Sequence, residues 1–101
     1  MPTKRDNVIQ DVIEAMENGN LRLSTHAQLR MTERSIVLSD VEEAIYSSNR
    51  EDHKDQLTKD GKDWKYALRG KSEAGKDLRI VVLFDDPKVL VITAIDKDLG
   101  S

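Results

Sequence analysis

A histidine and two arginines recur at every fourth position of the segment "LSTHAQLRMTERSI", residues 23–36. Residues four apart share one face of a helix, so His26, Arg30 and Arg34 would lie on one side of it. Histidine is a common general base near neutral pH, and arginines together with the free N–H groups of a helix start can hold a phosphate. The segment is therefore a candidate site for phosphate chemistry. A helix cap followed by a solvated basic face explains the same pattern, and the spacing leaves both interpretations open.

A second candidate site is the alternating segment "WKYALRGK". Lys65, Arg69 and Lys71 would share one face of a strand, with Tyr66 close by. Cations on a sheet surface suit contact with an RNA backbone, and a tyrosine ring can stack on a base. A solvated basic face, with Trp64 and Tyr66 in the core, would produce the same alternation.

The other polar residues give weaker signals. His53 stands among charged residues, and two histidines without any cysteine form no recognisable metal-ligand spacing. Asp85 and Asp86, which precede Pro87, are typical of a turn between strands. The sequence has no phosphate-binding glycine loop and no motif for a serine nucleophile. We therefore expect neither a metal site nor a cofactor.

The charge distribution matters more than the net charge. A net charge of −3 over 101 residues argues mildly against a protein that coats nucleic acid. Positive charge gathers in two segments: residues 22–34 hold three arginines and one glutamate, and residues 58–79 hold seven basic and four acidic residues. If the fold brings these two segments together, an acidic protein carries a local basic patch.

The length and composition predict one small domain, which we place over residues 1–101. With 38% hydrophobic residues, the chain can bury one modest core. No apolar run reaches the roughly 20 residues of a membrane span, and the N-terminus lacks the apolar stretch of a secretory signal. The sequence therefore predicts a soluble, cytoplasmic protein without a membrane partner.

Three helices are expected in the first half of the chain. Apolar residues at spacings of three and four mark a helix over residues 5–17, which "NGN" ends. Thr25 with Gln28, and Ser39 with Glu42, match capping boxes at the starts of a second and a third helix.

Beyond residue 49 the hydrophobic period changes from that of a helix to that of a strand. Strands are expected at residues 50–58 and 64–71 and over the apolar segments "LRIVVLF" and "KVLVITAI". Helices followed by strands indicate an α+β fold. We expect three N-terminal helices packed on one face of a roughly four-stranded antiparallel sheet.

Two long segments, "THAQLRMTERSIVLSDVEEAI" and "WKYALRGKSEAGKDLRIVVLFDDPKVLVITAID", resemble the bacterial domain-of-unknown-function 4258 family. The resemblance covers about residues 22–96 and leaves residues 1–20 as an additional N-terminal helix. Family members share a histidine-alanine pair, an arginine-methionine pair, an "ERGI" helix end and a closing "VVITAY" strand. Here Ser35 replaces the glycine and Ile95 replaces the final aromatic residue. The family looks related to BrnT-like, RelE-like and motility-quorum-sensing-regulator-like toxins of type II toxin–antitoxin pairs.

This resemblance implies a RelE-like or barnase-like RNase architecture, metal-independent cleavage of RNA by its own 2′-hydroxyl, and an antitoxin protein as partner. By position, it implies that His26 is a base or orienting group and that Arg30 and Arg69 clamp the phosphate. Tyr66 or Lys71 would assist them. Further RNA contacts are expected from Arg34, Lys65, Lys71 and Arg79.

Two other functions stay open at this point: a non-catalytic protein-interaction module of the same fold, and a small regulator that binds RNA without cutting it. A nuclease would bring Arg30 and Arg69 together with His26. An interaction module would bury His26 or bond it internally.

Overall fold

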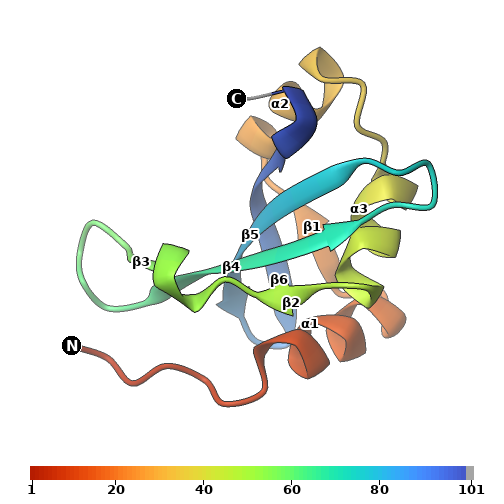
Figure 1. Cartoon of the computed structure of the whole chain (residues 1–101). Coiled ribbons are helices and arrows are strands. Elements are labelled where there is room, and N and C mark those ends of the chain that lie inside the picture. Colours follow the sequence, from red (N-terminus) through yellow and green to blue (C-terminus); the bar gives the residue numbers. More distant parts are fainter. Residues whose placement is uncertain (100–101) are drawn as a thin grey trace.

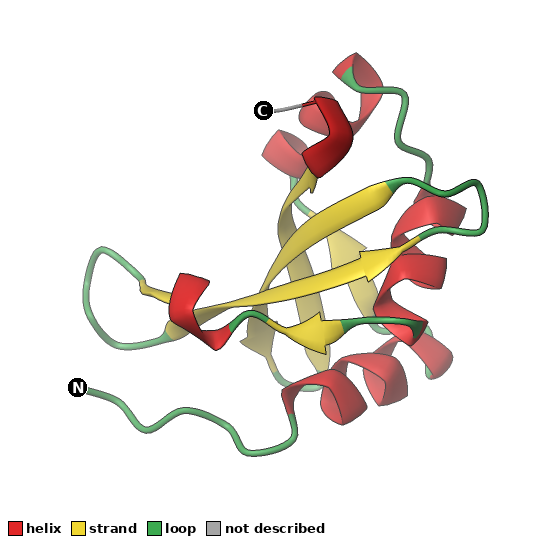
Figure 2. Cartoon of the chain, viewed as in Figure 1, coloured by secondary structure: helices red, strands yellow, loops and turns green. Residues whose placement is uncertain are grey.

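Helices occupy the first half of the chain and long strands the second half (Figures 1 and 2). The computed structural model describes residues 1–99. The three α-helices are α1 (Val8–Glu17), α2 (Thr25–Glu33) and α3 (Leu38–Tyr46). The strands are β1 (Leu21–Leu23), β2 (Asn49–Arg50), β3 (Gln56–Leu57), β4 (Trp64–Lys71), β5 (Asp77–Asp85) and β6 (Lys88–Asp96), and two short 3₁₀ turns are η1 (Asp52–Lys54) and η2 (Lys97–Leu99).

The six strands form one mixed sheet with the order β1-β6-β5-β4-β2, and β3 also pairs with β4. The three long strands, β4, β5 and β6, pair antiparallel as expected, but β1 joins the edge parallel to β6. The prediction of an α+β fold is confirmed, whereas the prediction of four strands, all antiparallel, is wrong. β1 has three residues, which is too short to show an alternating pattern. The expected strand over residues 50–58 is interrupted by η1, which leaves two strands of two residues each.

The helix starts differ from the predicted caps by one or a few residues. α1 begins at Val8, so residues 1–7 form an extended arm rather than helix. The cap of α2 is Ser24, whose hydroxyl oxygen accepts a hydrogen bond from the Ala27 N–H at 3.0 Å. α3 begins after Val37, whose N–H donates to the Asp40 carboxylate at 3.1 Å. The expected capping boxes are therefore wrong, because the neighbouring side chains take those positions.

One core cluster joins the helices to the three long strands. Alternation along β4 turns Tyr66 and Leu68 to this core and Lys65 and Arg69 to the opposite side. We call these two sides of the sheet the core face and the outer face. The core face also carries buried side chains of β5 and β6 and meets buried side chains of α1 and α3: Leu78, Ile80, Val82, Val89, Val91, Val8, Val12, Val41, Ala44 and Ile45.

The contact between α3 and β4 is close enough to require a glycine. A Cβ atom at Gly70 would lie 2.0 Å from the Ala44 carbonyl oxygen. Any other residue at this position would push α3 away from the sheet, so Gly70 sets the distance between helix and strand.

The N-terminal arm is tied to the sheet by specific bonds. The Trp64 indole N–H donates to the Pro2 carbonyl oxygen at 2.8 Å, and the Arg5 N–H donates to the Tyr66 hydroxyl oxygen at 2.8 Å. The Lys4 ammonium lies 3.1 Å from the Asp55 carboxylate and over the Trp64 ring. The arm therefore belongs to the folded structure.

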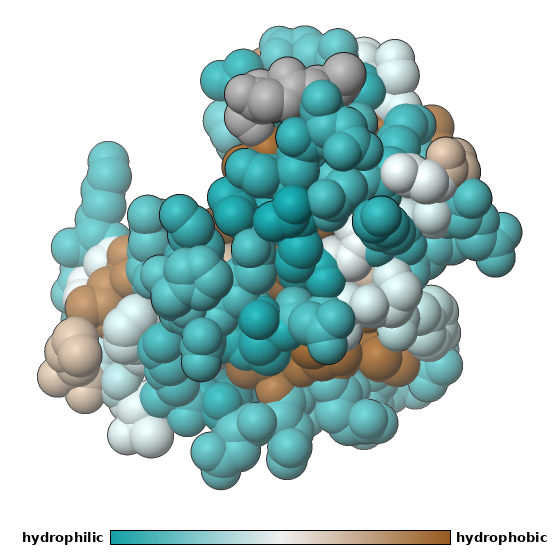
Figure 3. Space-filling model, viewed as in Figure 1, coloured by the Kyte–Doolittle hydropathy of each residue, from teal (hydrophilic) through white to brown (hydrophobic). Residues whose placement is uncertain are grey.

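Hydrophilic side chains cover most of the surface in the view of Figure 3, and the apolar ones form small separate groups. None of the helices within residues 1–99 is both long enough and apolar enough to cross a membrane.

Candidate active site

The outer face of the sheet carries a pocket of about 690 Å³ at the start of α2. Its walls come from α2, from the segment of η1 and β3, and from the three long strands. We call it the His26 pocket. It is lined by Ser24, His26, Lys54, Gln56, Lys65, Arg79, Val81, Ile92, Thr93 and Ile95.

The cap of α2 positions His26 beside β6. The Ser24 N–H donates to the Val91 carbonyl oxygen at 2.9 Å, and the Ser24 hydroxyl donates to the Ile92 carbonyl oxygen at 3.4 Å. Because Ser24 also caps the helix, the first turn of α2 starts at a fixed place on this strand. His26 stands in that first turn and projects into the pocket.

A β-bulge shapes the floor of the pocket. Val81 pairs with Thr93, and the next residue, Val82, pairs with Val91, so Ile92 is an extra residue in β6. In a regular strand, two consecutive side chains point to opposite faces, yet Ile92 and Thr93 both line the pocket. The bulge thereby adds an apolar and a hydroxyl side chain to the same surface.

The buried carboxylate of Asp55 fixes the segment that carries Lys54 and Gln56. Its side chain has no exposed area, and it accepts hydrogen bonds from the Arg50 guanidinium, the Ala67 N–H and the Lys4 ammonium. Burial opposes ionisation of Asp55, but these donors outweigh it and hold the pKa of this carboxyl below its usual range. Arg50 before η1 and Asp55 after it are therefore both bonded to β4, so η1 is held at both of its ends.

Several polar groups in the pocket have no partner. Within residues 1–99, the His26 ring and the ammonium groups of Lys54 and Lys65 make no hydrogen bond and no ion pair, and the same holds for the Gln56 amide. Groups of this kind are free to bind a ligand without first breaking an internal bond. Three of the four carry or can carry positive charge, so they favour an anion.

Arg79 in the same pocket is already held by Glu51. The Arg79 Nε atom donates to one Glu51 oxygen at 2.7 Å and its Nη2 atom to the other at 3.2 Å. Arg69 also donates to Glu51, at 3.2 Å, and forms two bonds of 2.7 and 2.8 Å with Asp77. We call these four residues the Glu51 ladder. Hydrogen bonds from Arg79, followed by those from Arg69, hold the pKa of Glu51 below its usual value.

The structure brings some of the sequence-predicted residues together. His26, Lys65 and Arg79 line one pocket although they come from α2, β4 and β5. Arg69 and Lys71 lie on the same face of the sheet but line a separate pocket of about 430 Å³. Residues 22–34 contribute Ser24 and His26 to this pocket but none of their three arginines, so the positive charge here comes from β4, β5 and Lys54.

Other predicted residues lie elsewhere. Tyr66 is on the core face with only 4% of its surface exposed, and its ring packs edge-on against Phe84. It therefore cannot stack a base on the outer face. Arg30 does not line the pocket, and its guanidinium pairs with Glu33 at 3.3 Å. Arg34 follows the last turn of α2 and is also not among the lining residues.

Sequence reasoning missed Lys54, Gln56, Ser24 and Thr93. Lys54 and Gln56 lie in a polar stretch without periodicity, which gave no signal for the direction of a side chain. The bonds of Asp55 decide that direction. The only hint in the sequence was that residues 50–58 were expected to form a strand close to the basic strand over residues 64–71.

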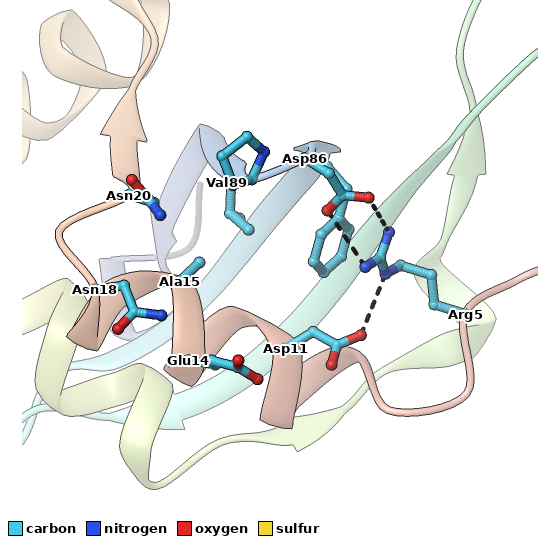
Figure 4. Close-up of a pocket in the computed structure, with 10 residues that line it drawn as sticks. Arg5, Asp11, Glu14, Ala15, Asn18, Asn20, Asp86 and Val89 are labelled. Carbon is cyan, nitrogen blue, oxygen red and sulfur yellow. Dashed lines mark hydrogen bonds and ion pairs between the residues drawn. The ribbon is translucent and has the colours of Figure 1, made fainter.

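A smaller pocket near the N-terminal arm is chemically different (Figure 4). It measures about 210 Å³, and its one cationic group, Arg5, lies 3.3 Å from Asp11 and 3.2 Å from Asp86. Asp11, Glu14 and Asp86 make its lining acidic, so it is less suited to an anion than the His26 pocket.

The fold and the site define a small α+β protein with a pocket on the outer face of a mixed sheet, lined by basic side chains and a histidine. Residues 23–96 match the family model described as "Domain of unknown function (DUF4258)", and the chain belongs to this family. The family predicted from the sequence is thereby confirmed, and the matched range begins one residue later than expected. A search of curated proteins and a search of solved structures each found no match. The relation to RNase toxins stays a prediction.

Proposed function

We propose that the protein is a metal-independent endoribonuclease whose active site is the His26 pocket. The observation that carries this proposal is the meeting of an unpaired imidazole with two unpaired ammonium groups and one arginine around a single pocket. Phosphodiester cleavage requires a group that moves protons and cations that neutralise charge on the phosphate. The His26 pocket supplies both on a rigid sheet.

In the proposed reaction, the neutral imidazole of His26 removes the proton of a ribose 2′-hydroxyl. The 2′-oxygen attacks the adjacent phosphorus, and a new P–O2′ bond forms while the P–O5′ bond breaks. The leaving 5′-oxygen takes a proton from the Lys65 ammonium. Arg79 and Lys54 bind the non-bridging oxygens, on which negative charge increases. The products are a 2′,3′-cyclic phosphate and a 5′-hydroxyl. Solvent then removes the proton that His26 gained and returns one to Lys65.

The apolar floor of the pocket supports a nucleotide as ligand. Val81, Ile92 and Ile95 offer an aliphatic surface on which an unstacked base can lie, and Thr93 and Gln56 offer polar atoms for its edge. RNA-binding proteins commonly recognise bases that have left the stack. A cationic wall beside an apolar floor matches a phosphate joined to a base.

We further propose that this activity is that of a toxin in a type II toxin–antitoxin pair, neutralised by an antitoxin protein. Support comes from the family resemblance of the histidine-alanine and arginine-methionine pairs. A RelE-like arrangement, with the helices on one face of the sheet and the site on the other, belongs to the same proposal. The joint core of α1, α3 and the long strands, with the His26 pocket on the outer face, is consistent with it.

A second candidate function is RNA binding without cleavage. Arg30 and Tyr66, which were expected to act with His26, lie outside the pocket, and His26 is its one imidazole group. This candidate uses the same cations but no proton transfer. Cleavage separates the two functions, because a protein that only binds RNA leaves it intact whether position 26 is histidine or alanine.

The test is cleavage of labelled RNA by the purified protein in excess EDTA. We expect His26→Ala to lower the cleavage rate by about 10²–10⁴-fold, the usual contribution of a general base. Lys88→Ala, which removes an exposed lysine at the opposite end of β6, is the matched control and should cut like the wild type. Equal cleavage by His26→Ala and wild type, at equal thermal stability, would contradict the proposed active site.

A further inference from the structure

A second pocket of about 430 Å³ lies on the same outer face, next to the end of α3 and β2. We call it the Lys71 pocket. It is lined by Ser47, Asn49, Arg69, Gly70, Lys71 and Asp77. Within the part of the chain that the structure describes, the Lys71 ammonium and the Asn49 amide make no hydrogen bond and no ion pair. Like the His26 pocket, it presents unpaired donors to solvent.

The Glu51 ladder separates the two pockets and is close to neutral. Arg69 and Arg79 stand opposite each other in the pairing of β4 with β5, and the Glu51 carboxylate bonds to both. Asp77 takes the other bonds of Arg69. Two guanidinium groups thus face two carboxylates. The positive charge outside the ladder stands at the two ends of the outer face, with Lys54 and Lys65 at one and Lys71 at the other. Lys71 stands opposite Asp77, whose carboxylate is bonded to Arg69.

The two ends are several nucleotides apart. Lys65 and Lys71 project from the same side of β4 and are separated by six positions, so their Cα atoms lie about 20 Å apart. A mononucleotide cannot contact both ends. An extended strand of several nucleotides can, and between the two ends the Nη1 atom of Arg79 makes no bond within residues 1–99.

We infer that the Lys71 pocket is a second phosphate subsite and that the ligand is a single-stranded RNA several nucleotides long. One phosphate lies in the His26 pocket, the backbone passes over the Glu51 ladder along β4, and a distant phosphate binds Lys71 and Asn49. A single strand fits because the apolar floor of the His26 pocket receives an unstacked base. The inference rests on the proposed function for the identity of the ligand, but it does not require cleavage.

The test measures binding of labelled 2′-O-methyl RNA, which has no free 2′-hydroxyl and cannot be cut. Oligonucleotides from a dinucleotide to a ten-nucleotide strand are titrated by fluorescence anisotropy at several salt concentrations. Wild type, Lys65→Ala, Lys71→Ala and the control Lys88→Ala are compared at equal melting temperature. Lys71 is exposed, so its removal is not expected to impair folding.

We expect Lys65→Ala to weaken binding at every length, and Lys71→Ala to weaken binding of the long strands alone. For those strands, the slope of log K against log salt should decrease by about 0.7, the value of one phosphate contact on a single strand. If Lys71→Ala binds long strands as Lys88→Ala does while Lys65→Ala is impaired, the subsite is overturned and the proposed function stands. If the wild type binds no RNA of any length, both are overturned.

Discussion

His26 and Ser35 show how much of this account depends on single positions. His26 is exposed in the first turn of α2 and makes no internal bond among residues 1–99, so no packing role explains a histidine there. Ser35 stands where related sequences have glycine, and its φ of 56° lies in the left-handed region. Glycine adopts this conformation without strain, whereas serine has a Cβ atom that opposes it.

Ser35→Gly should stabilise the protein. A non-glycine residue in the left-handed region costs about 1 kcal/mol, which glycine avoids. The bonds made here by the backbone, including that from the Lys76 ammonium to the Ser35 carbonyl oxygen at 2.8 Å, are retained. Urea unfolding should show a gain of about 0.5–1 kcal/mol in the free energy of unfolding. The control Ser39→Gly, within α3, should lose a similar amount. Equal losses in both variants would contradict the strain at Ser35.

At the scale of elements, η1 is the piece that completes the pocket. It interrupts the pairing of β2 and β3 with β4, and Lys54, at its end, lines the His26 pocket. Its position depends on Asp55, which bonds to Arg50, to the Ala67 N–H and to Lys4 of the N-terminal arm. The arm and the pocket are thus linked through one buried carboxylate.

Asp55→Asn should therefore affect both stability and binding. An amide cannot replace a carboxylate that pairs with two cations, and the loss of hydrogen bonds to a charged group costs about 2–3 kcal/mol. RNA affinity should also decrease, because Lys54 loses its fixed position. Asp52→Asn, an exposed neighbour in η1, is the matched control. Chemical denaturation and anisotropy measure the two effects. If Asp55→Asn and Asp52→Asn have the same stability and the same RNA affinity, then Asp55 does not anchor the segment of η1 and β3.

The sequence predicts an element well when its hydrophobic pattern is long. β4 alternates over eight residues, β5 and β6 are apolar runs within strands of nine residues, and the apolar stripe of α1 spans about three turns, so their types were predictable. β1 was not, since three residues show no period. The bulge at Ile92 was hidden within a continuous apolar run.

Residues of the candidate site could be predicted only where they belong to these well-patterned elements. Lys65 and Arg79 belong to long strands, where alternation assigns a face, and His26 belongs to a helix with a visible start. Tyr66 was expected to act beside Lys65 and Arg69. Adjacent residues of a strand point to opposite faces of the sheet, so Tyr66 lies on the core face instead. Lys54 was missed because its direction depends on tertiary bonds.

At the scale of the whole molecule, the charges are arranged in networks rather than scattered. A protein with a net charge of −3 still presents unpaired ammonium groups on its outer face, those of Lys54, Lys65 and Lys71, because the carboxylates there are bonded to arginines. The acidic groups of this region are engaged in bonds: Glu51, Asp55 and Asp77 all accept hydrogen bonds from arginines. These bonds couple the stability of the fold to pH.

The protein should lose stability in acid. Hydrogen bonds from arginines are the main cause that lowers the pKa values of Glu51, Asp55 and Asp77 in the folded state. The pKa of Asp40 is lowered by a hydrogen bond from the Val37 N–H and then by one from the Lys76 ammonium, which together outweigh burial. The unfolded chain therefore binds more protons than the folded one once the pH falls to about 4, near the usual carboxyl values of 3.8 and 4.5. The stabilisation that these four carboxylates give to the folded state is complete above their usual pKa values. It decreases as the pH falls through their pKa values in the folded state.

Melting temperatures recorded from pH 7 to pH 2.5 measure this effect. They should be nearly constant in the upper part of this range and decrease below about pH 4.5. Asp55→Asn should show a smaller decrease than the wild type, because one of the four carboxyls is absent. A wild-type melting temperature that is unchanged or higher at pH 3 would contradict the role of these networks.

Binding of RNA in the His26 pocket can be followed by the NMR signals of the His26 ring during titration with 2′-O-methyl RNA. The chain has two histidines, so His53, which does not line the pocket, serves as an internal reference. If RNA binds in the His26 pocket, the His26 ring signals shift with saturation while those of His53 change less, and Lys65→Ala weakens the response. RNA binding that leaves His26 unchanged would contradict the placement of the active site.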